Sequence, residues 1–482
     1  MISGADRKEG LKQEHNMTDI ISRLAAVLDK GGLITGADVA ARPADWMGFS
    51  TCQAKAVVRP KNTEQLSEVM KICHAAGQSV VAAGGLTGLV HGADATDLDI
   101  LISFERMTDV ESLDPVGRTM TVQSGAQLQK VQEAAEAESL LFSVDLGSRG
   151  SATIGGNIAT NAGGNQVLRY GMMRDHVLGL EAVLADGTIL SSMNQLIKNN
   201  SGYDLKHLFI GAEGTLGFVT RAVLRLHPRP TTENTALVAI ADFESLSRFF
   251  GFIGQNIGGD LTAFEVMWSD YYQTIAVDSG RHVAPIPGGH AYYVIVEANG
   301  CDSIRDAERF VEILGQAVEQ ELVTDAVIAS SKAQRNAIWA IREDFEGLLA
   351  TVFPAAVFDI SLPINEMEKY IVGLRERLKE NWGDAARLII FGHLGDGNLH
   401  VIVSPRPWDD AARALAEKAV YEPLAAIGGS ISAEHGIGLE KRKWLHLSRS
   451  PEELALMQQM KQALDPKGIL NPDKIWAADN RI

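Results

Sequence analysis

With 482 residues, the chain is long enough for two or three domains, each with its own hydrophobic core. Its net charge of −17 argues against nucleic acid or an anionic membrane surface as the main partner, because neutralising phosphates requires a basic face. Apolar runs are interrupted by glycine or polar residues well before membrane-spanning length, so we expect no transmembrane segment.

Residues 1–50 are expected to form a polar N-terminal segment followed by a helix. The helical pattern begins only after Met17, which leaves this residue as an alternative start of translation. Neither a secretory nor a transit peptide is convincing here. The three cysteines, Cys52, Cys73 and Cys301, are scattered without CxxC spacing, which fits reduced thiols. We therefore expect a cytoplasmic protein, with peripheral contact to a membrane left open.

The next segment alternates between strand and helix patterns. AVVRP predicts a strand, residues 62–77 predict a helix that ends at glycine, and SVVAAGG predicts a second strand. GGLTGLVHG follows at 84–92, where four glycines in nine positions would let backbone N–H groups converge on an anion. An ordinary turn is an equally good interpretation, and the GxGxxG fingerprint is absent.

A longer glycine-rich stretch occupies residues 145–171, with few apolar side chains to bury. We expect a structured, functional loop rather than a core element, with a disordered linker as the alternative. A hairpin turned at Asp186–Gly187 follows directly and encloses the stretch. Residues 202–228 repeat the pattern of a glycine-rich bend before an apolar strand, and we place a domain boundary at residue 228.

Beyond that boundary, strands and amphipathic helices alternate, which is typical of an α+β domain with an antiparallel sheet and helices on one face. The predicted helix at 330–354 carries Arg335 and Arg342 seven residues apart, on nearly the same face. Residues 387–404 predict two strands joined by a Gly/Asp/Asn turn.

This hairpin places His393 and His400 on opposite arms of one turn, and a helical spacer at 408–427 leads to Glu434 and His435. Two histidines and one carboxylate form a recurrent catalytic metal set, and we expect a divalent ion, Zn²⁺ or Mn²⁺. Neighbouring residues on an extended loop point in opposite directions, so if Glu434 binds the metal, His435 is a nearby base. Solvated side chains near turns remain the alternative.

Six motifs occur together in one order along the chain: GGLTG, DLGSRGSATIGGNIATNAGG with RYG behind it, GAEGTLG, GHLGDGNLH, SAEHGIG and DPKGILNPDKIW. In this combination the chain closely resembles the flavin-linked D-2-hydroxyacid dehydrogenases, a group that includes D-lactate, glycolate and D-2-hydroxyglutarate dehydrogenases. These enzymes have the vanillyl-alcohol-oxidase (VAO)-like fold. The resemblance covers nearly the whole chain, from Ala54 to Trp476.

The resemblance implies an α+β fold with a two-lobed FAD-binding domain of the PCMH/VAO type at residues 50–228. An FAD-linked-oxidase C-terminal domain, the substrate or cap domain, would span 229–462, and a tail at 463–482 would return to the FAD-binding domain. FAD would be held without a covalent link, since Leu86 is not a histidine. The implied FAD contacts are Gly84, Gly85, Thr87, Gly88, Leu89, Gly150, Ser151, Gly155, Gly156, Asn157, Thr160, Asn161, Ala162, Gly163, Gly164 and Asn471.

For the reaction, the resemblance implies oxidation of a small D-2-hydroxyacid to the 2-oxoacid. The metal ligands would be His393, His400 and Glu434, the base His435, and the group that grips the substrate carboxylate Arg342. Electrons would pass to a non-oxygen acceptor such as a quinone, a cytochrome or an electron-transfer flavoprotein. A homodimer is possible.

Three positions depart from the pattern of the D-2-hydroxyglutarate dehydrogenases. Val357 stands where those relatives have a lysine, and Asp344 and Glu346 add acids after the substrate arginine. These changes argue against a second substrate carboxylate held as in those relatives. Two alternatives remain: a non-redox transferase of the alkyl-glycerone-phosphate-synthase type, which favours a histidine-rich run at this loop, and a flavin-binding protein without turnover.

Overall fold

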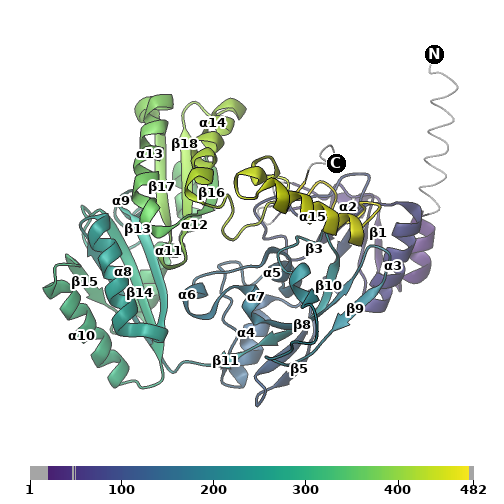
Figure 1. The fold of residues 1–482 in the computed structure, drawn as a ribbon, viewed down its shortest axis with the longest axis horizontal. Helices are drawn as coiled ribbons and strands as arrows, with labels where there is room; N and C mark the ends of the chain where they lie inside the picture. Colours follow the sequence, from purple (N-terminus) through teal and green to yellow (C-terminus); the bar gives the residue numbers. More distant parts are fainter. Residues whose placement is uncertain (1–19, 46–47, 49, 477–482) are drawn as a thin grey trace.

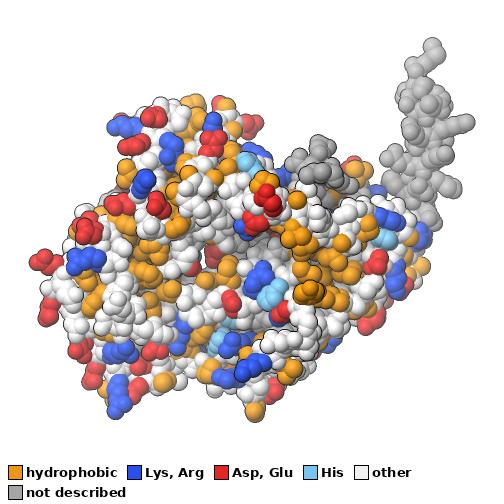
Figure 2. Space-filling view, viewed as in Figure 1, with side chains coloured by type: hydrophobic (Ala, Val, Ile, Leu, Met, Phe, Trp, Pro, Cys, Tyr) orange, Lys and Arg blue, Asp and Glu red, His pale blue; other side chains and the backbone are white. Residues whose placement is uncertain are grey.

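The computed structural model describes residues 20–45, 48 and 50–476, and these form two lobes (Figure 1). The expectations for residues 1–16 and Met17 lie outside the described residues. On the face shown in Figure 2, acidic and basic side chains are intermingled over the lobe on the left rather than gathered into one basic patch.

The first lobe begins with a four-stranded sheet in the order β1-β2-β4-β3. Its elements are β1 (Leu33–Thr35), α2 (Ala37–Ala40), β2 (Ala56–Val58), α3 (Thr63–Ala76), β3 (Val80–Ala83) and β4 (Ile100–Ser103). The Asn62 side chain accepts a hydrogen bond from Gln65 N and so caps α3, and Gly77 ends it with a left-handed conformation. The predicted strand–helix–strand unit is therefore present, although β4 lies between β2 and β3 and runs parallel to both.

An antiparallel five-stranded sheet, in the order β5-β6-β10-β8-β9, completes this lobe. Its strands are β5 (Val110–Asp114), β6 (Thr119–Gln123), β8 (Val177–Val183), β9 (Ile189–Ser192) and β10 (Phe218–Arg225). The β8–β9 pair confirms the hairpin predicted at Asp186–Gly187. The helix α4 (Leu128–Ala137) packs its apolar side into the core of this sheet.

The prediction that residues 145–171 form only a loop is wrong in part. The stretch contains the helices α5 (Ile154–Thr160) and α6 (Val167–Tyr170), and α7 (Met173–His176) follows it. Ile154 and Ile158 are fully buried in the core of the five-stranded sheet. These two side chains, four residues apart, occupy one helical face. The surrounding glycines hid this short apolar pair in the sequence.

The second lobe is built on an antiparallel seven-stranded sheet, in the order β15-β12-β14-β13-β17-β18-β16, which confirms the α+β class. Its strands are β12 (Thr232–Ile240), β13 (Leu261–Trp268), β14 (Tyr292–Gly300), β15 (Asp325–Ile328), β16 (Ala356–Ser361), β17 (Ala386–His393) and β18 (Asn398–Pro405). The change of sheet between the short strand β11 (His227–Pro228) and β12 supports the proposed domain boundary at residue 228.

Helices cover both faces of this sheet, so the expectation of helices on one face is wrong. One face carries α8 (Phe243–Ile257), α10 (Arg305–Glu319), α13 (Ile364–Trp382) and α14 (Asp410–Tyr421). The other carries α9 (Ser269–Tyr272), α11 (Lys332–Glu343) and α12 (Phe345–Val352). Every residue of β13 is buried, and such strands show no polar face in the sequence.

The C-terminal segment runs back to the first lobe after α15 (Pro451–Leu464), as Figure 1 shows. Val80 N donates to Ile469 O at 2.8 Å, and Asn471 N donates to Val80 O at 2.8 Å. These bonds add the tail to the edge of the four-stranded sheet at β3, and they support the proposed return of residues 463–482 to the FAD-binding domain.

Candidate active site

The hairpin of the sequence motif GHLGDGNLH forms one side of the candidate site. His393 is the last residue of β17, and His400 lies on β18 opposite Phe391. The turn between them closes through Gly397, whose φ of +82° suits glycine. The two imidazole rings are 5.5 Å apart, centroid to centroid. The predicted placement on opposite arms of one turn is therefore confirmed.

The loop 432–438 brings a carboxylate to this hairpin. Ligand atoms of His393, His400 and Glu434 lie within 4.8 Å of one another, close enough to share one ion. A second set in the described chain, made by Asp359, His400 and His435, meets the same distance limit. The choice between the two sets depends on what else binds Asp359.

Asp359 is fully buried, and its oxygens already have partners. Oδ2 accepts hydrogen bonds from the backbone N–H groups of Ala433, Glu434 and His435 at 3.1, 2.8 and 2.9 Å. Oδ1 accepts one from Asn398 Nδ2 at 2.7 Å. This carboxylate is committed to holding the loop, so the first set, with Glu434, suits a metal better.

Lys441 supplies a buried countercharge to Asp359, with Nζ 3.7 Å from Oδ2. Burial opposes ionisation of Asp359, but the charges of His435, Lys441 and His400 together with the loop N–H groups hold its pKa well below the usual range. Sequence reasoning missed both residues. The available signal was a single acid within an otherwise apolar strand, which must find a partner when buried.

Glu434 and His435 point to different neighbours, as expected for adjacent residues on an extended loop. Glu434 Oε1 accepts a hydrogen bond from Gly164 N at 2.8 Å, within the glycine-rich stretch of the first lobe. His435 Nδ1 lies 3.9 Å from Asp359 Oδ2, and its side chain keeps 21% of its surface exposed. An imidazole that is largely enclosed, lies near a carboxylate and keeps part of its surface open can accept a proton from a bound ligand.

Glu265 is a second buried carboxylate that sequence reasoning missed. It lies directly opposite His393 in the β13–β17 pair, and His393 Nδ1 is 2.5 Å from its Oε1. Its Oε2 accepts a hydrogen bond from Arg342 Nε at 3.0 Å and forms an ion pair with Arg342 Nη2, which lies 2.9 Å away. Burial opposes its ionisation, but the charges of His393 and Arg342 hold the pKa of Glu265 below the usual range.

Helix α11 presents both predicted arginines to the sheet, and their placement on one face is confirmed. Arg342 is 8% exposed, and its guanidinium lies over the Phe391 ring at 4.6 Å. Arg335 forms two hydrogen bonds of 2.9 Å with Glu297, which also accepts a bond of 2.8 Å from Trp339 Nε1. The helix is thus fixed to the sheet by two arginine–glutamate pairs.

The glycine-rich stretches of the first lobe meet face to face. A Cβ on Gly84 would lie 2.5 Å from Thr153 Oγ1, and one on Gly85 would lie 1.9 Å from Ser151 O. A Cβ on Gly88 would meet nothing within 4 Å. The loop at Gly84 and Gly85 therefore approaches the loop at Ser151 and Thr153 too closely for a side chain on either glycine, and there is open space at Gly88. The Asn157 amide Nδ2 is buried without a hydrogen-bond partner, so these residues fit a polar, phosphate-bearing cofactor such as FAD.

Several of the predicted cofactor residues already have partners within the protein. Thr160 Oγ1 donates to Gly156 O, and Asn161 Oδ1 accepts from Arg174 N. Asn471 Oδ1 accepts from Ala82 N at 2.9 Å, two residues before Gly84. The other predicted contacts line the same two stretches: Thr87, Leu89, Gly150, Gly155, Ala162, Gly163 and Gly164. Their contacts with FAD stay predictions.

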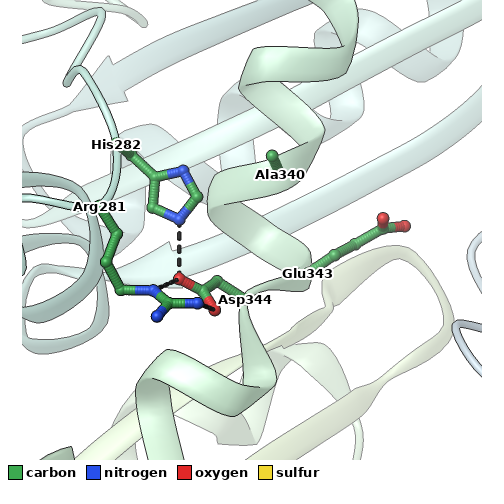
Figure 3. Close-up of a pocket in the computed structure, with 5 residues that line it drawn as sticks. All are labelled: Arg281, His282, Ala340, Glu343 and Asp344. Carbon is green, nitrogen blue, oxygen red and sulfur yellow. Dashed lines mark hydrogen bonds and ion pairs between the residues drawn. The ribbon is translucent and has the colours of Figure 1, made fainter.

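The junction of α11 and α12 borders a cavity of about 510 Å³, shown in Figure 3. Its lining includes Asp344, which accepts hydrogen bonds from Arg281 Nε at 2.7 Å and from Gly347 N at 2.9 Å. His282 Nε2 is 2.8 Å from the same carboxylate. Burial opposes its ionisation, but Arg281 and His282 lower the pKa of Asp344 to about 2. Asp344 is therefore an occupied helix cap rather than a free acid.

A second cavity, of about 270 Å³, lies between the lobes beside α11. Its charged lining residues are Asp145, Arg149, Glu297, Arg335 and Glu343. Glu343 accepts a hydrogen bond from Asn165 Nδ2 at 3.2 Å, and burial, together with the charge of Asp145, raises its pKa. Val357, which also departs from the pattern of the D-2-hydroxyglutarate dehydrogenases, is 38% exposed and shares a strand face with Asp359.

Comparison with known proteins identifies two domain families in the chain. The FAD binding domain matches residues 54–192, and the C-terminal domain of FAD linked oxidases matches residues 229–475. The mitochondrial D-2-hydroxyglutarate dehydrogenase of Arabidopsis thaliana is 37% identical over 89% of this chain and 76% of its own length. The D-2-hydroxyglutarate dehydrogenase of Stutzerimonas stutzeri (strain A1501) is 36% identical over 96% of this chain and its full length.

Similar folds are found among solved structures. p-Cresol methylhydroxylase with substrate bound has a TM-score of 0.77 at 14% identity, covering 97% of this chain and 98% of that one. Alkyldihydroxyacetonephosphate synthase has a TM-score of 0.73 at 16% identity, covering 94% of this chain and 85% of that one. At these identities the likeness establishes the fold alone.

Proposed function

The chain belongs to the FAD-linked D-2-hydroxyacid dehydrogenases, flavoenzymes that oxidise a hydroxyacid, and from this premise we propose how its own site works. His393, His400 and Glu434 hold a divalent metal, and His435 accepts the substrate's hydroxyl proton. One observation carries this proposal. The Glu434 carboxylate lies within ligand reach of both histidines and also accepts a hydrogen bond from Gly164 N of the predicted FAD-binding stretch.

FAD would be held by the backbone N–H groups of the facing glycine-rich stretches, with Asn157 Nδ2 as a further donor. When bound, it supplies the acceptor for the hydride that leaves the substrate Cα. Glu434 ties this half of the site to the other, because one side chain bonds to the glycine-rich stretch and belongs to the proposed ligand set. The 2-oxoacid is therefore formed at the meeting point of the two lobes.

His393, His400 and Glu434 would hold a divalent ion, which would lower the pKa of the substrate hydroxyl. Arg342 binds the substrate carboxylate. Its Nε and Nη2 are bound to Glu265, and within the described residues its Nη1 has no hydrogen-bond partner, so that nitrogen is left for the substrate. His435 takes the hydroxyl proton, since Asp359 lies behind its Nδ1 and 21% of its side-chain surface is open to ligand and water.

The substrate of this chain differs from that of its dicarboxylate-oxidising relatives, and we base this proposal on Val357 and Glu346. An apolar residue at 357 and an exposed acid at 346 do not offer a second substrate carboxylate the grip that a lysine gives. Asp344 does not bear on binding of a second substrate carboxylate, because Arg281 and His282 compensate its charge.

The electron acceptor is proposed to be a quinone, a cytochrome or an electron-transfer flavoprotein rather than oxygen. No helix within the described residues is both long and apolar enough to cross a membrane. Several relatives are named as mitochondrial, so a cytoplasmic location, like a homodimer, stays a prediction. Reoxidation of the reduced flavin by a soluble quinone at least tenfold faster than by air-saturated buffer would support the dehydrogenase assignment.

An anaerobic flavin-bleaching series tests the reaction. D-Lactate, glycolate, D-malate and D-2-hydroxyglutarate are mixed with the holoenzyme, with L-lactate as the stereochemical control. At least one D-2-hydroxyacid is expected to bleach the oxidised-flavin absorbance. A non-redox transferase of the alkyl-glycerone-phosphate-synthase type, or a flavin-binding protein without turnover, would show no bleaching with any of them.

The proposed base is tested with His435→Asn, which removes the proton acceptor while keeping a side chain of similar size. Flavin reduction by the best substrate is expected to slow by roughly 10²–10⁴-fold, with the FAD content unchanged, because general base catalysis contributes this much. An unchanged rate of reduction would exclude His435 as the base.

The proposed metal site is tested by elemental analysis of the purified protein. About one divalent ion per chain is expected, and His393→Ala is expected to lose it, because two remaining ligands bind a divalent ion weakly. Retention of a full equivalent of metal by this variant would refute the ligand assignment.

A further inference from the structure

Glu265 contacts two groups that the proposed function uses for different tasks. Its Oε1 faces His393, a proposed metal ligand, and its Oε2 accepts a hydrogen bond from Nε of Arg342, the proposed carboxylate binder, and forms an ion pair with its Nη2. The side chain is 1% exposed and lies at the end of the β13–β17 pair, directly opposite His393. One carboxylate thus fixes both halves of substrate recognition.

Glu265 determines which nitrogen of His393 is free. A carboxylate accepts hydrogen bonds but does not donate them, so the proton of the neutral imidazole must sit on Nδ1 at this 2.5 Å contact. The lone pair is then on Nε2, the nitrogen left for an ion, and the carboxylate makes that nitrogen more basic. A glutamine at this position has one accepting oxygen and one donating NH2 group. It could therefore accept a hydrogen bond from only one of the two partners.

Glu265 also determines where the Arg342 guanidinium lies. Nε donates a hydrogen bond to Oε2 and Nη2 forms an ion pair with the same oxygen, and the guanidinium is stacked over Phe391, which itself lies opposite Met267 of β13. This leaves a single nitrogen, Nη1, directed to other partners. Because His393 and Arg342 share one carboxylate, a change in the position or charge of either is transmitted to the other.

We propose that Glu265 is a positioning residue that couples metal binding at His393 to the orientation of Arg342. The inference rests on the proposed function and deepens it, because it makes the metal and the substrate carboxylate depend on one buried side chain. In this arrangement the protein recognises the hydroxyacid group as a unit.

The neighbouring strand offers a matched control for a purely structural role. Glu297 on β14 is 2% exposed and binds Arg335 of the same helix through two hydrogen bonds, as well as Trp339 Nε1. Neither partner belongs to the proposed ligands or to the substrate arginine. Glu265→Gln and Glu297→Gln therefore each weaken one buried glutamate–arginine pair that attaches α11 to the sheet. Only Glu265→Gln also changes the surroundings of His393.

The first measurement is the dissociation constant of Zn²⁺ and of Mn²⁺ for metal-stripped, FAD-loaded protein, by competition with a chromogenic chelator. Glu265→Gln is expected to weaken binding by about 10–100-fold, as removal of a ligand-orienting carboxylate does. Glu297→Gln is expected to stay within about threefold of wild type. Equal metal affinities for the two variants at equal FAD content would overturn the proposal.

The second measurement is a double-mutant cycle with metal affinity as its readout. Arg342→Met is expected to change the Zn²⁺ dissociation constant by more than about threefold while Glu265 is present, because the two residues are in contact. The change is expected to fall below that in the Glu265→Gln background. Strictly additive effects would mean that Glu265 does not transmit the coupling.

Failure of this inference can be told from failure of the proposed function. If wild-type protein binds no divalent ion, both the metal site and the role of Glu265 are refuted. If wild type binds one equivalent and His393→Ala loses it while Glu265→Gln binds as tightly as wild type, the metal site stands and only the positioning role is overturned.

Discussion

At the scale of single residues, the site is defined by two carboxylates as much as by its histidines. Glu265 lies opposite His393 and Asp359 lies opposite His400, each on the neighbouring strand of the sheet. Both carboxylates are buried and held ionised by surrounding cations and N–H groups. The sheet register therefore places a carboxylate opposite each histidine. Glu265 contacts the His393 ring directly, whereas Asp359 Oδ1 lies 4.0 Å from His400 Nδ1.

Asp359→Asn tests the second of these pairs. The amide would present N–H groups toward the loop N–H donors and leave Lys441 buried without a full countercharge. Breaking a buried pair of this kind costs about 3–5 kcal/mol, so a lower midpoint of thermal unfolding and reduced metal content are expected. Differential scanning calorimetry and elemental analysis measure both. The exposed Asp384→Asn serves as the control, and equal behaviour of the two variants would contradict this role of Asp359.

At the scale of elements, local sequence patterns predicted the strands and helices well. Caps such as Asn62 and turns such as Asp186–Gly187 have short-range causes, and the alternation of strands and helices is visible along the chain. The errors have long-range causes. Strands buried on both faces gave no sign of the second helical layer, and the glycines around Ile154 concealed a short core helix.

For the site, the sequence predicted the residues that stand in motifs but not the partners that hold them. The histidines and glycines occur in compact runs, whereas Glu265 lies 128 residues before His393 and becomes its neighbour only through the β13–β17 register. Glu213, in the motif GAEGTLG, accepts a hydrogen bond from Ile437 N of the loop 432–438, although the two residues are 224 positions apart. Pairing of remote strands cannot be deduced from the periodicity of one segment.

The close approach of the two glycine-rich stretches predicts different outcomes for Gly85→Ala and Gly88→Ala. A Cβ on Gly85 would lie 1.9 Å from the backbone oxygen of Ser151, so the loops must separate. Gly85→Ala is therefore expected to weaken FAD binding at least tenfold and to lower the midpoint of thermal unfolding. At Gly88 there is open space, and the unfolding midpoint of FAD-free protein is expected to stay within about 1–2 °C of wild type. Fluorescence titration with FAD and calorimetry compare the two.

At the scale of the whole molecule, buried contacts between the lobes assemble the site. Glu213 of the first lobe accepts hydrogen bonds from Ile437 N and Gly438 N at 2.7 Å each, within the loop that carries Glu434 and His435. Glu434 in turn accepts one from Gly164 N. The loop is thus held between Asp359 on one side and Glu213 on the other, so the two lobes together determine the position of the proposed base.

A buried imidazole, His176, and a half-buried one, His227, at the exit from the first lobe link the stability of the whole molecule to pH. His176 is 1% exposed and bonds through Nε2 to Ser143 Oγ at 3.2 Å, and the His227 ring lies 5.5 Å away. Burial lowers the pKa of His176 to about 4, and burial together with the charge of His176 lowers the pKa of His227 to about 4.

The sign of the effect follows from these values. Between pH 6.5 and about 4 the unfolded chain binds protons at these sites and the folded protein does not, so acidification favours unfolding. For His176, the gap from 6.5 to about 4 corresponds to roughly 3 kcal/mol at most. His176→Asn keeps a polar partner for Ser143 but does not titrate. Urea unfolding of both proteins from pH 7.5 to 4.5 is expected to show wild type losing more stability than the variant, because only wild type must keep this imidazole neutral. A difference between them that does not change with pH would mean that His176 has the same pKa in the folded and the unfolded protein.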